Sequence, residues 1–229
     1  MGHRVARSCG SRLGRVARRI GGLDGEQRRA ARREALLDAA LDLFARQGYL
    51  GTSIEQLCQE AHVSTKSFYD VFTSREDCYL GLMRRSTVHL QTVVGQALEG
   101  APADDESAAA AVVLNAMAHA FGDDPRHAIV LFGHGTATTV DVERERRTNR
   151  RWAAEFVAGI WRQYSPDVPV PPGLATGTSG GLFDIVADWV TDVDGPPALD
   201  VDELHGSLRA FYGAVVAGRR LSYGKDFLS

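Results

Sequence analysis

A short stretch in the first third of the chain carries side chains that suit contact with a nucleic acid. Small hydroxyl groups and one ammonium group can exchange hydrogen bonds with base edges, while a tyrosine hydroxyl and a guanidinium can hold phosphates. Phe68, Val71 and Phe72 fall on the opposite side, where they can anchor the stretch to a core. The polar residues that could do this chemistry are Ser64, Thr65, Lys66, Ser67, Tyr69 and Arg75.

Two short helices joined by a tight turn would position these side chains. Ser53 and Gln56 have the spacing of a capping box, which predicts a first short helix that ends near Ala61. Ser64 is a favourable N-cap for a second short helix, which runs to Phe72. Such a pair is the smallest unit that can place a helix end in the DNA major groove, so the second helix is the expected recognition element.

Helical patterns also fill the chain on both sides of this pair. Leu37, Ala40, Leu41 and Phe44 share one face of an amphipathic helix that should end at Gly48. No segment shows sustained strand alternation. The predicted fold class is therefore all-α, with about nine helices: an N-terminal three-helix helix-turn-helix unit and a larger C-terminal helical bundle. The helices expected after the pair span residues 74–98, 106–121, 125–136, 140–164, 175–192 and 200–218.

The net charge of −3 hides an uneven distribution. Residues 1–33 contain ten arginines against Asp24 and Glu26, whereas the rest of the chain is acidic. A basic arm ahead of an acidic body indicates an anionic partner at the N-terminal end, and nucleic acid is the first candidate. Residues 1–25 are rich in Gly and Arg without periodicity, which predicts disorder, so a solvated tail is an equal alternative.

Composition excludes several classes of protein. The 229 residues are 44% hydrophobic and 24% charged, as in ordinary globular proteins. No stretch approaches the ~20 apolar residues that cross a bilayer, and the Arg-rich start lacks the apolar core of a secretory signal. We therefore expect a cytoplasmic protein with no membrane partner. Cys9, Cys58 and Cys78 fit neither a disulfide framework nor a zinc site; reduced thiols are expected, with redox sensing at Cys58 or Cys78 as an alternative.

Residues 30–80 resemble the DNA-binding domain of the tetracycline-repressor (TetR) family in the order and spacing of caps, turn and aromatic residues. Two positions depart from the family pattern. His62 replaces the glycine usual in the turn and would be strained if its φ is positive, and Asp70 puts a negative charge on the recognition helix. The matching residues are Phe44, Gly48-Tyr49, Thr52-Ser53, Ala61, Val63-Ser64, Phe68-Tyr69, Phe72 and Ser74-Arg75-Glu76.

The resemblance implies a homodimer that places one recognition helix in each half of a palindromic double-stranded DNA operator. It divides the chain into a basic N-terminal arm (1–25), a DNA-binding domain (26–77) and a ligand-sensing and dimerisation domain (78–229). Most of the family represses transcription, so a repressor is expected. By family position, phosphates would be held by Thr52, Ser53, Tyr69 and Arg75, and base edges would be read by Thr65, Lys66 and Ser67.

In the TetR family the second domain dimerises through its last two long helices and holds a small-molecule effector between the others. Here those helices would be 175–192 and 200–218, whose many small residues permit close helix approach. The alternating charges of Glu143–Arg151 predict a solvated helix face. No cofactor is expected, and no metal, because the histidines lack ligand spacing. The pocket candidates, each more often simple core, are Met117, Phe121, His134, Trp152, Phe156, Phe183 and Trp189.

One motif favours an enzyme instead. Residues 177–181 match the G-x-S-x-G nucleophile elbow, and acidic residues and then His205 follow in the chain order of a serine hydrolase. That chemistry needs Ser179 on a sharp strand-to-helix turn, and residues 171–176 do not resemble a strand. We therefore expect no enzyme. A serine hydrolase is one alternative, and a DNA-binding regulator without any small-molecule ligand is another.

Overall fold

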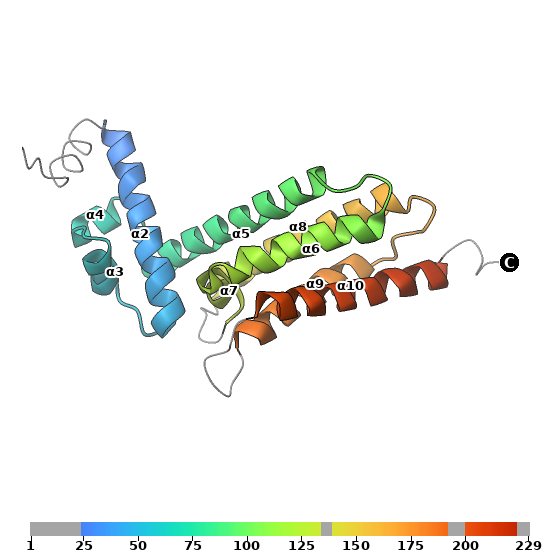
Figure 1. Cartoon of the computed structure of the whole chain (residues 1–229). Helices are drawn as coiled ribbons and strands as arrows, with labels where there is room; N and C mark the ends of the chain where they lie inside the picture. The colour runs from blue at the N-terminus through green and yellow to red at the C-terminus, as the bar shows by residue number, and fades with distance from the viewer. Residues whose placement is uncertain (1–23, 134–138, 192–199, 224–229) are drawn as a thin grey trace, which may run out of the picture.

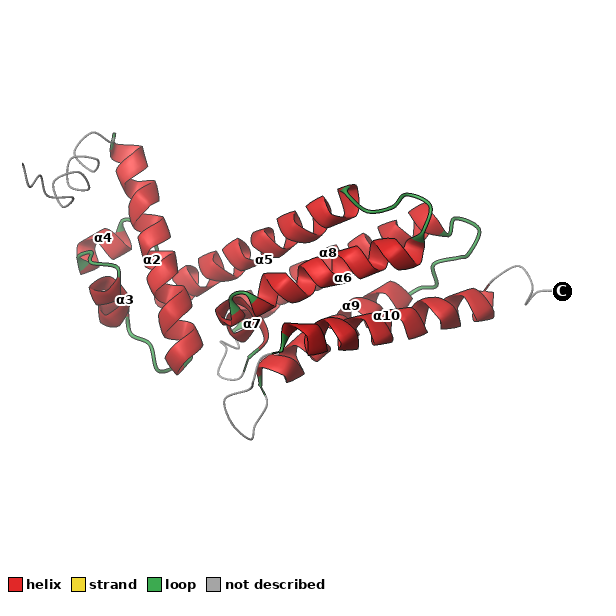
Figure 2. Ribbon diagram, in the orientation of Figure 1, coloured by secondary structure: helices red, strands yellow, loops and turns green. Residues whose placement is uncertain are grey.

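The computed structural model describes residues 24–133, 139–191 and 200–223, and all regular secondary structure in them is helical (Figures 1 and 2). The predicted all-α fold class and the predicted order of helices are therefore confirmed. The first three helices are α2 (Gly25–Gln47), α3 (Ile54–Glu60) and α4 (Thr65–Tyr69). After them come α5 (Arg75–Glu99), α6 (Glu106–Gly122), α7 (Pro125–Phe132), α8 (Val140–Tyr164), α9 (Leu174–Val190) and α10 (Val201–Tyr223).

The helices form two connected parts (Figure 1). Helices α2, α3 and α4 gather at one end of the molecule, and α5 runs from this end along the second part. There α5, α6, α8, α9 and α10 lie lengthwise as a bundle, with the short α7 at the junction against α2. One hydrophobic core extends through both parts, from Leu36 on α2 to Tyr212 on α10. None of the described helices combines the length and the apolar character that a membrane span requires.

Side-chain caps set where the first helices begin. The Ser53 hydroxyl accepts a hydrogen bond from the Gln56 N–H at 3.2 Å, and the Gln56 side chain accepts one from the Ser53 N–H at 2.8 Å. The predicted capping box at the start of α3 is thus present. In the other early helices, a side-chain oxygen likewise accepts from the N–H three residues on; the pairs are Asp24–Gln27, Ser64–Ser67 and Ser74–Asp77.

Three helix ends differ from the prediction. Helix α7 stops at Phe132 rather than near Thr136, because the backbone of Gly133 is extended. Helix α4 ends at Tyr69 rather than at Phe72, and the Asp70 carbonyl that follows accepts a hydrogen bond from Arg29 Nε of α2 at 2.8 Å. Helix α10 passes through Gly218 to Tyr223. The next residue, Arg219, is buried and stacks 4.8 Å from the centre of the Trp161 ring, which holds the last turns against the bundle.

Helices α9 and α10 approach each other closely at Gly181. A Cβ atom at this position would lie 2.4 Å from the tip of the Phe211 ring, so the ring lies where a side chain would otherwise be. Val186 of α9 and Leu208 of α10 are fully buried in the same core. Small residues in these two helices thus allow the close approach that the sequence predicted for them.

Replacing Gly181 by Ala should destabilise the protein, because the new methyl group must displace the Phe211 ring. Overpacking costs about 1–3 kcal/mol, which exceeds the gain of up to about 1 kcal/mol from the better helix propensity of Ala. Gly159→Ala on α8 is the matched control, since open space lies where its Cβ would be, and it should stabilise the protein. Urea unfolding followed by circular dichroism measures both. Equal stabilisation by the two variants would contradict the packing argument.

Candidate functional site

Helix α4 presents polar side chains to solvent at both of its ends. Phe68, on the opposite side, is fully buried and fixes the helix to the core through its ring, 5.8 Å from that of Phe72. Ser67 is half-buried, and its hydroxyl lies 3.0 Å from the Ser64 hydroxyl. The exposed residues are Ser64, Thr65, Lys66 and Tyr69, the last with 55% of its surface accessible. The residues predicted to contact DNA on this helix are therefore together and mostly accessible.

The turn between α3 and α4 is a Schellman motif centred on His62. The Val63 N–H donates to the Cys58 carbonyl at 2.9 Å, and the His62 N–H donates to the Gln59 carbonyl at 3.2 Å. The motif requires the first of these two residues to adopt the left-handed backbone conformation, and His62 has a φ of 53°. The conformational strain predicted from the missing glycine is therefore present at this turn.

Thr52 and Arg75 hold the start of α3 from inside the domain. The Thr52 hydroxyl is buried and donates to the Gly48 carbonyl at 2.8 Å. Arg75 donates to the Thr52 carbonyl, and its guanidinium lies 4.3 Å from the centre of the Tyr49 ring. Because an enclosed hydroxyl cannot reach a phosphate, the contact predicted for the Thr52 side chain does not fit this arrangement. Ser53 and Arg75, which keep further donors, stay predicted phosphate contacts.

Of the ten arginines in residues 1–33, only those that follow the basic arm fall within the described residues, because residues 1–23 lie outside them. Arg29 and Arg33 lie on α2. Arg29 ties α2 to the end of α4 through the Asp70 carbonyl, and Arg33 stacks 5.4 Å from the centre of the Phe72 ring. These arginines therefore help to pack the domain, a role that composition alone did not predict.

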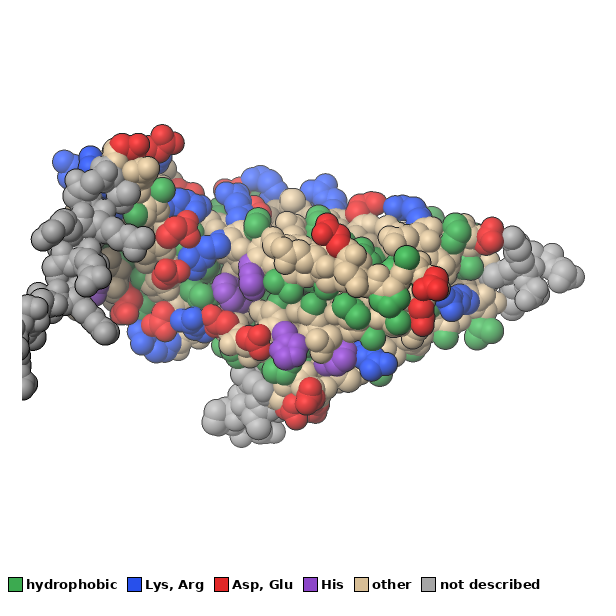
Figure 3. Space-filling view, turned by 45° about the horizontal axis from the view of Figure 1, so that its top comes forward, with side chains coloured by type: hydrophobic (Ala, Val, Ile, Leu, Met, Phe, Trp, Pro, Cys, Tyr) green, Lys and Arg blue, Asp and Glu red, His purple; other side chains and the backbone are tan. Residues whose placement is uncertain are grey.

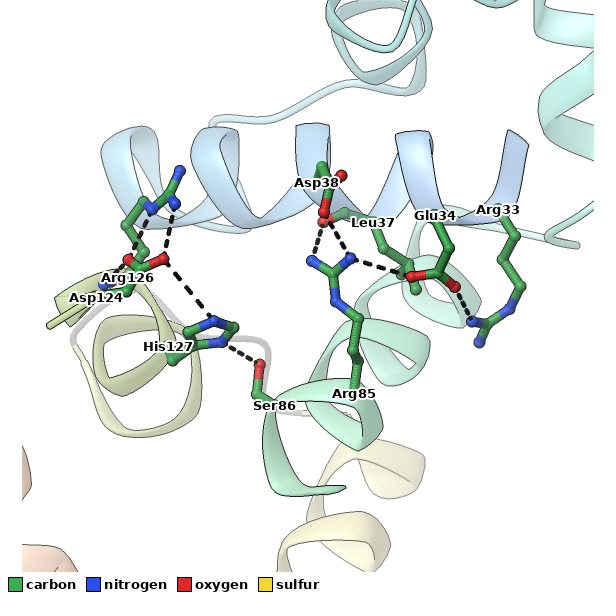
Figure 4. A network of polar contacts seen from close by, with 9 residues as sticks. All are labelled: Arg33, Glu34, Leu37, Asp38, Arg85, Ser86, Asp124, Arg126 and His127. Atoms are coloured by element: carbon green, nitrogen blue, oxygen red, sulfur yellow. Dashed lines mark hydrogen bonds and ion pairs between the residues drawn. The ribbon is translucent and has the colours of Figure 1, made fainter. Parts of the chain in front are cut away.

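Charged side chains of both signs gather where α2 meets the bundle (Figure 3). Arg85 of α5 makes the central contact of this junction (Figure 4). It donates to the Asp38 carboxylate at 2.7 Å and to the Leu37 carbonyl at 3.0 Å, and its Nη1 lies 3.4 Å from the Glu34 carboxylate. One guanidinium thus holds a full turn of α2 against α5.

Helix α7 contributes a second set of polar contacts to the junction (Figure 4). Arg126 pairs with Asp124 at 2.7 Å and lies 3.9 Å from Asp42 of α2. His127 Nδ1 lies 2.8 Å from the Ser86 hydroxyl of α5. Burial lowers the pKa of His127 despite the nearby Asp124 carboxylate, so this imidazole is mainly neutral at neutral pH.

Tyr79 lies buried at the centre of the junction. Its hydroxyl donates to the Val130 carbonyl of α7 at 2.7 Å, and its ring centre lies 5.3 Å from that of Phe44 and 5.2 Å from that of Tyr49. The Arg75 guanidinium stacks on the same Tyr49 ring. Helix α7 is thereby joined to the helix-turn-helix through a continuous series of contacts.

The bundle contains an apolar inner cavity of about 50 Å³ between α5, α6, α8, α9 and α10. Trp152 and Phe156 form part of its α8 wall, with ring centres 5.4 Å apart. Four of the residues predicted to contact a ligand line this cavity: Met117, Trp152, Phe156 and Phe183. They stay predicted ligand contacts, now brought to one place by three helices, α6, α8 and α9.

A larger outer cavity of about 250 Å³ adjoins the inner cavity and shares Leu90, Trp152 and Phe183 with it. Its walls come from α5, α7, α8 and α9, including Leu131 and Phe132 of α7. Apolar residues form most of the wall and polar groups form a rim. The two cavities together therefore run from an apolar interior to a polar opening.

The polar rim of the outer cavity was missed by sequence reasoning. Asn149 donates to the Thr87 hydroxyl at 2.9 Å, and Arg146 and Arg150 line the opening beside Asp184. The α8 residues here belong to the run of alternating charges that predicted a solvated helix face. A single helix pattern could not show which of those charges faces a neighbouring helix.

Two of the predicted ligand contacts that the structure describes, Phe121 and Trp189, do not line either of these two cavities. Phe121 is buried and packs edge-on against Phe132, with ring centres 5.7 Å apart. The Trp189 indole donates to the Asp200 carbonyl at 3.2 Å, just ahead of α10. His134 lies outside the described residues. Phe121 and Trp189 therefore fit roles in packing and helix positioning better than ligand contact.

The G-x-S-x-G stretch lies inside helix α9. Ser179 is buried, and its hydroxyl donates to the Thr176 carbonyl at 3.0 Å. The described residues ahead of α9 contain helices and loops but no strand, so the strand-to-helix elbow required of a hydrolase nucleophile is not formed here. The motif's glycines serve packing instead: Gly181 admits Phe211, and Gly180 lines the outer cavity.

Cys58 and Cys78 are buried free thiols. Burial raises the pKa of Cys78 to about 12 and raises that of Cys58 above its ordinary value. Because the thiolate is the reactive form, enclosed and protonated thiols react slowly. The redox-sensing alternative therefore does not fit either position.

Comparison with known proteins agrees with this geometry. Residues 36–82, from α2 into α5, match the model of the bacterial regulatory proteins of the tetR family. This chain carries a TetR-family helix-turn-helix domain. A stretch of 63 residues is 38% identical to the HTH-type transcriptional regulator RutR of Escherichia coli (strain K12); it makes up 27% of this chain and spans 30% of RutR. The likeness to RutR is thus confined to the N-terminal TetR-family domain.

The two-part architecture also resembles solved regulator structures. FadR from Bacillus subtilis, in complex with stearoyl-CoA, superposes with a TM-score of 0.66 at 18% identity, covering 81% of this chain and 98% of FadR. AibR, in complex with isovaleryl coenzyme A and operator DNA, gives a TM-score of 0.60 at 15% identity, covering 78% of this chain and 96% of AibR. At these identities the likeness concerns the fold alone.

Replacing His62 by Gly should stabilise the TetR-family domain, because Gly adopts the positive φ of the Schellman turn without steric cost. The left-handed conformation costs other residues about 1–2 kcal/mol, and the greater freedom of Gly in the unfolded chain returns part of this. A net gain of about 0.5–1 kcal/mol in urea unfolding is expected. His62→Ala is the control, since it removes the imidazole and keeps the strain. A gain of the same size with Ala would contradict the backbone explanation.

Proposed function

We propose that this protein is a ligand-responsive transcriptional regulator that binds a palindromic DNA operator as a homodimer and acts as a repressor. The observation that carries the proposal is the geometry of α3 and α4. A Schellman turn and a buried Phe68 fix α4 so that its polar residues project from the domain. The family match to residues 36–82 supports the same function for the same residues.

In this proposal α4 enters the major groove, where Thr65, Lys66 and Ser67 read base edges. Ser53, Tyr69 and Arg75 hold phosphates on either side. The Lys66 ammonium can donate bidentately to a guanine edge.

The homodimer is proposed to form through α9 and α10. One side of α10 is exposed in the single chain and consists largely of small or apolar residues, some of which line a hollow beside α6. Leu221 is 74% exposed on this helix. Close packing of two such helices about a two-fold axis would remove the apolar surface from water. These residues are Ala210, Gly213, Ala214, Ala217, Gly218 and Leu221.

Effector control is supported by the way the cavity walls reach the DNA-binding domain. Helix α7 supplies Leu131 and Phe132 to the outer cavity, and its Val130 carbonyl accepts the Tyr79 hydrogen bond at the junction. Helix α5 lines both cavities and begins at Arg75. A ligand that shifts either helix would move the recognition helix, and operator and ligand would then affect each other's affinity equally. FadR and AibR, each named with an acyl-coenzyme A, support a small-molecule effector in this fold.

Lys66→Ala and Tyr69→Ala should each raise the operator dissociation constant roughly 10- to 100-fold, because each loses about 1–3 kcal/mol of contact. Fluorescence anisotropy measures this on a fragment from upstream of the protein's own gene, or on a site enriched from random sequences. A scrambled fragment and a salt series accompany each titration. Arg162→Ala is the matched control, since this exposed α8 arginine pairs only with Glu155 among the contacts seen.

The two contact types give different signatures in this titration. Loss of a base contact at Lys66 should reduce the preference for the operator over the scrambled fragment. A phosphate contact there would instead weaken binding to all sequences alike and lower the salt slope by about 1. Wild-type protein that enriches no sequence from a random pool would overturn the proposed function.

Gly213→Arg should convert the dimer into a monomer, because a charged side chain would enter the centre of the proposed α10 interface. Gly213 is exposed, and open space surrounds its missing Cβ, so the single chain should fold normally. Analytical ultracentrifugation measures the association and circular dichroism checks the helix content. Gly159→Arg, at an equally open and exposed position on α8, should remain dimeric. A dimeric Gly213→Arg protein would place the interface elsewhere.

A further inference from the structure

Three hollows in the C-terminal bundle follow one another from its interior to its surface. The inner cavity shares Leu90, Trp152 and Phe183 with the outer cavity. The outer cavity in turn shares Arg150 with a shallow surface hollow of about 480 Å³ between α8 and α9. A single elongated molecule could therefore occupy all three.

The chemistry of the walls changes along this path. The inner cavity is lined by aliphatic and aromatic side chains, with the Ser179 hydroxyl already engaged by the Thr176 carbonyl. The outer cavity adds the Thr87–Asn149 pair, two arginines and Asp184. Among the residues that the structure describes, arginines of α8 and Thr176 of α9 line the surface hollow. These arginines are Arg144, Arg147, Arg150 and Arg151.

The surface hollow keeps an excess of positive charge after its ion pairs are considered. Glu143 pairs with both Arg147, at 3.4 Å, and Arg150, at 2.7 Å, so one carboxylate serves two guanidiniums. Asp141 pairs with Arg144. The neighbouring Glu145 is directed to Arg84 of α5 at 2.9 Å, away from this group. Asp184 remains at the opening of the outer cavity, and no carboxylate lines the surface hollow itself.

We propose that the cavity binds an amphiphile with an aliphatic chain and a phosphate-bearing head group. This inference rests on the proposed function, since it names the class of effector. The chain occupies the inner and outer cavities, where burial of apolar surface contributes about 25 cal/mol per Å². The head group extends out of the outer cavity beside Arg150 and lies in the surface hollow against the arginines of α8.

A phosphate fits the opening better than a carboxylate or a neutral head group. A guanidinium donates bidentately to phosphate oxygens, and several guanidiniums within one hollow match a group that carries more than one negative charge. A neutral head group would leave the excess positive charge of this hollow without a counter-charge from the ligand. Asp184 stands on the other side of the opening and disfavours an anion that stops there, so the head group must extend to the α8 side.

Gly180 of α9 leaves open space at the wall of the outer cavity, at the position where its Cβ would be. Thr176, one helical turn earlier, lines the surface hollow, so this strip of α9 faces the whole exit path. A large side chain at position 180 would block this path without changing any charge.

Isothermal titration calorimetry of the full chain with decyl phosphate and with 1-decanol, both below their aggregation limits, tests the proposal. The wild-type protein should bind decyl phosphate at least tenfold more tightly than 1-decanol. The double variant Arg150→Gln, Arg151→Gln should lose this preference and keep its affinity for 1-decanol within about twofold. Gly180→Leu should weaken both ligands. Arg162→Gln, at a distant exposed position on the same helix, should behave as wild type.

Equal affinity of the wild-type protein for the two ligands would overturn the proposal, and so would a double variant that matches Arg162→Gln. Operator binding measured in parallel separates this result from the proposed function. Loss of the phosphate preference with intact operator binding would remove only the head-group site. A phosphate preference that leaves operator affinity unchanged would support the site and remove its role in regulation.

Discussion

A buried tyrosine hydroxyl at the junction constrains the orientation of the N-terminal domain relative to the helical bundle. The Tyr79 side chain is 1% exposed, and a polar group enclosed to this degree needs a partner, which the Val130 carbonyl provides. The same ring packs against Phe44 and Tyr49, so its position is fixed from both sides. The orientation of the TetR-family domain therefore depends on where α7 holds that carbonyl. Arg85 of α5 and Arg126 of α7 add contacts from these two helices to α2.

Much of the fold could be predicted from the sequence because local capping residues mark where many of its helices begin or end. Capping residues such as Ser53 and Ser64 and the glycine after α2 act within a few residues, and local patterns record such effects well. Arg29 and Arg219, by contrast, hold the end of α4 and the last turns of α10 by reaching across to other helices. Contacts between distant segments leave no local signal.

The candidate site shows the same difference: features set by local sequence could be predicted, and features set by contacts between distant segments could not. The polar face of α4 was predictable because helix periodicity separates it from Phe68. Thr52 was placed on that surface by resemblance, yet its hydroxyl is turned inward to the Gly48 carbonyl. The arginines of α8 were taken as a solvated face because their proximity to Gly180 and Thr176 exists only after α8 and α9 have packed. The G-x-S-x-G stretch shows the reverse error, in which a short local pattern suggests chemistry that its helix does not permit.

The length of α5 has a mechanical consequence. It contains 25 residues in one unbroken helix, which makes it about 37 Å long. Pivoting such a rod by about 5° about its far end would carry its first residue sideways by roughly 3 Å, close to one base-pair step. Small displacements of the wall near Thr87 and Leu90 are therefore magnified before they reach Arg75. In the proposed effector response, the part of α5 within the bundle would form the short arm of a lever, and the recognition helix would move with the long arm.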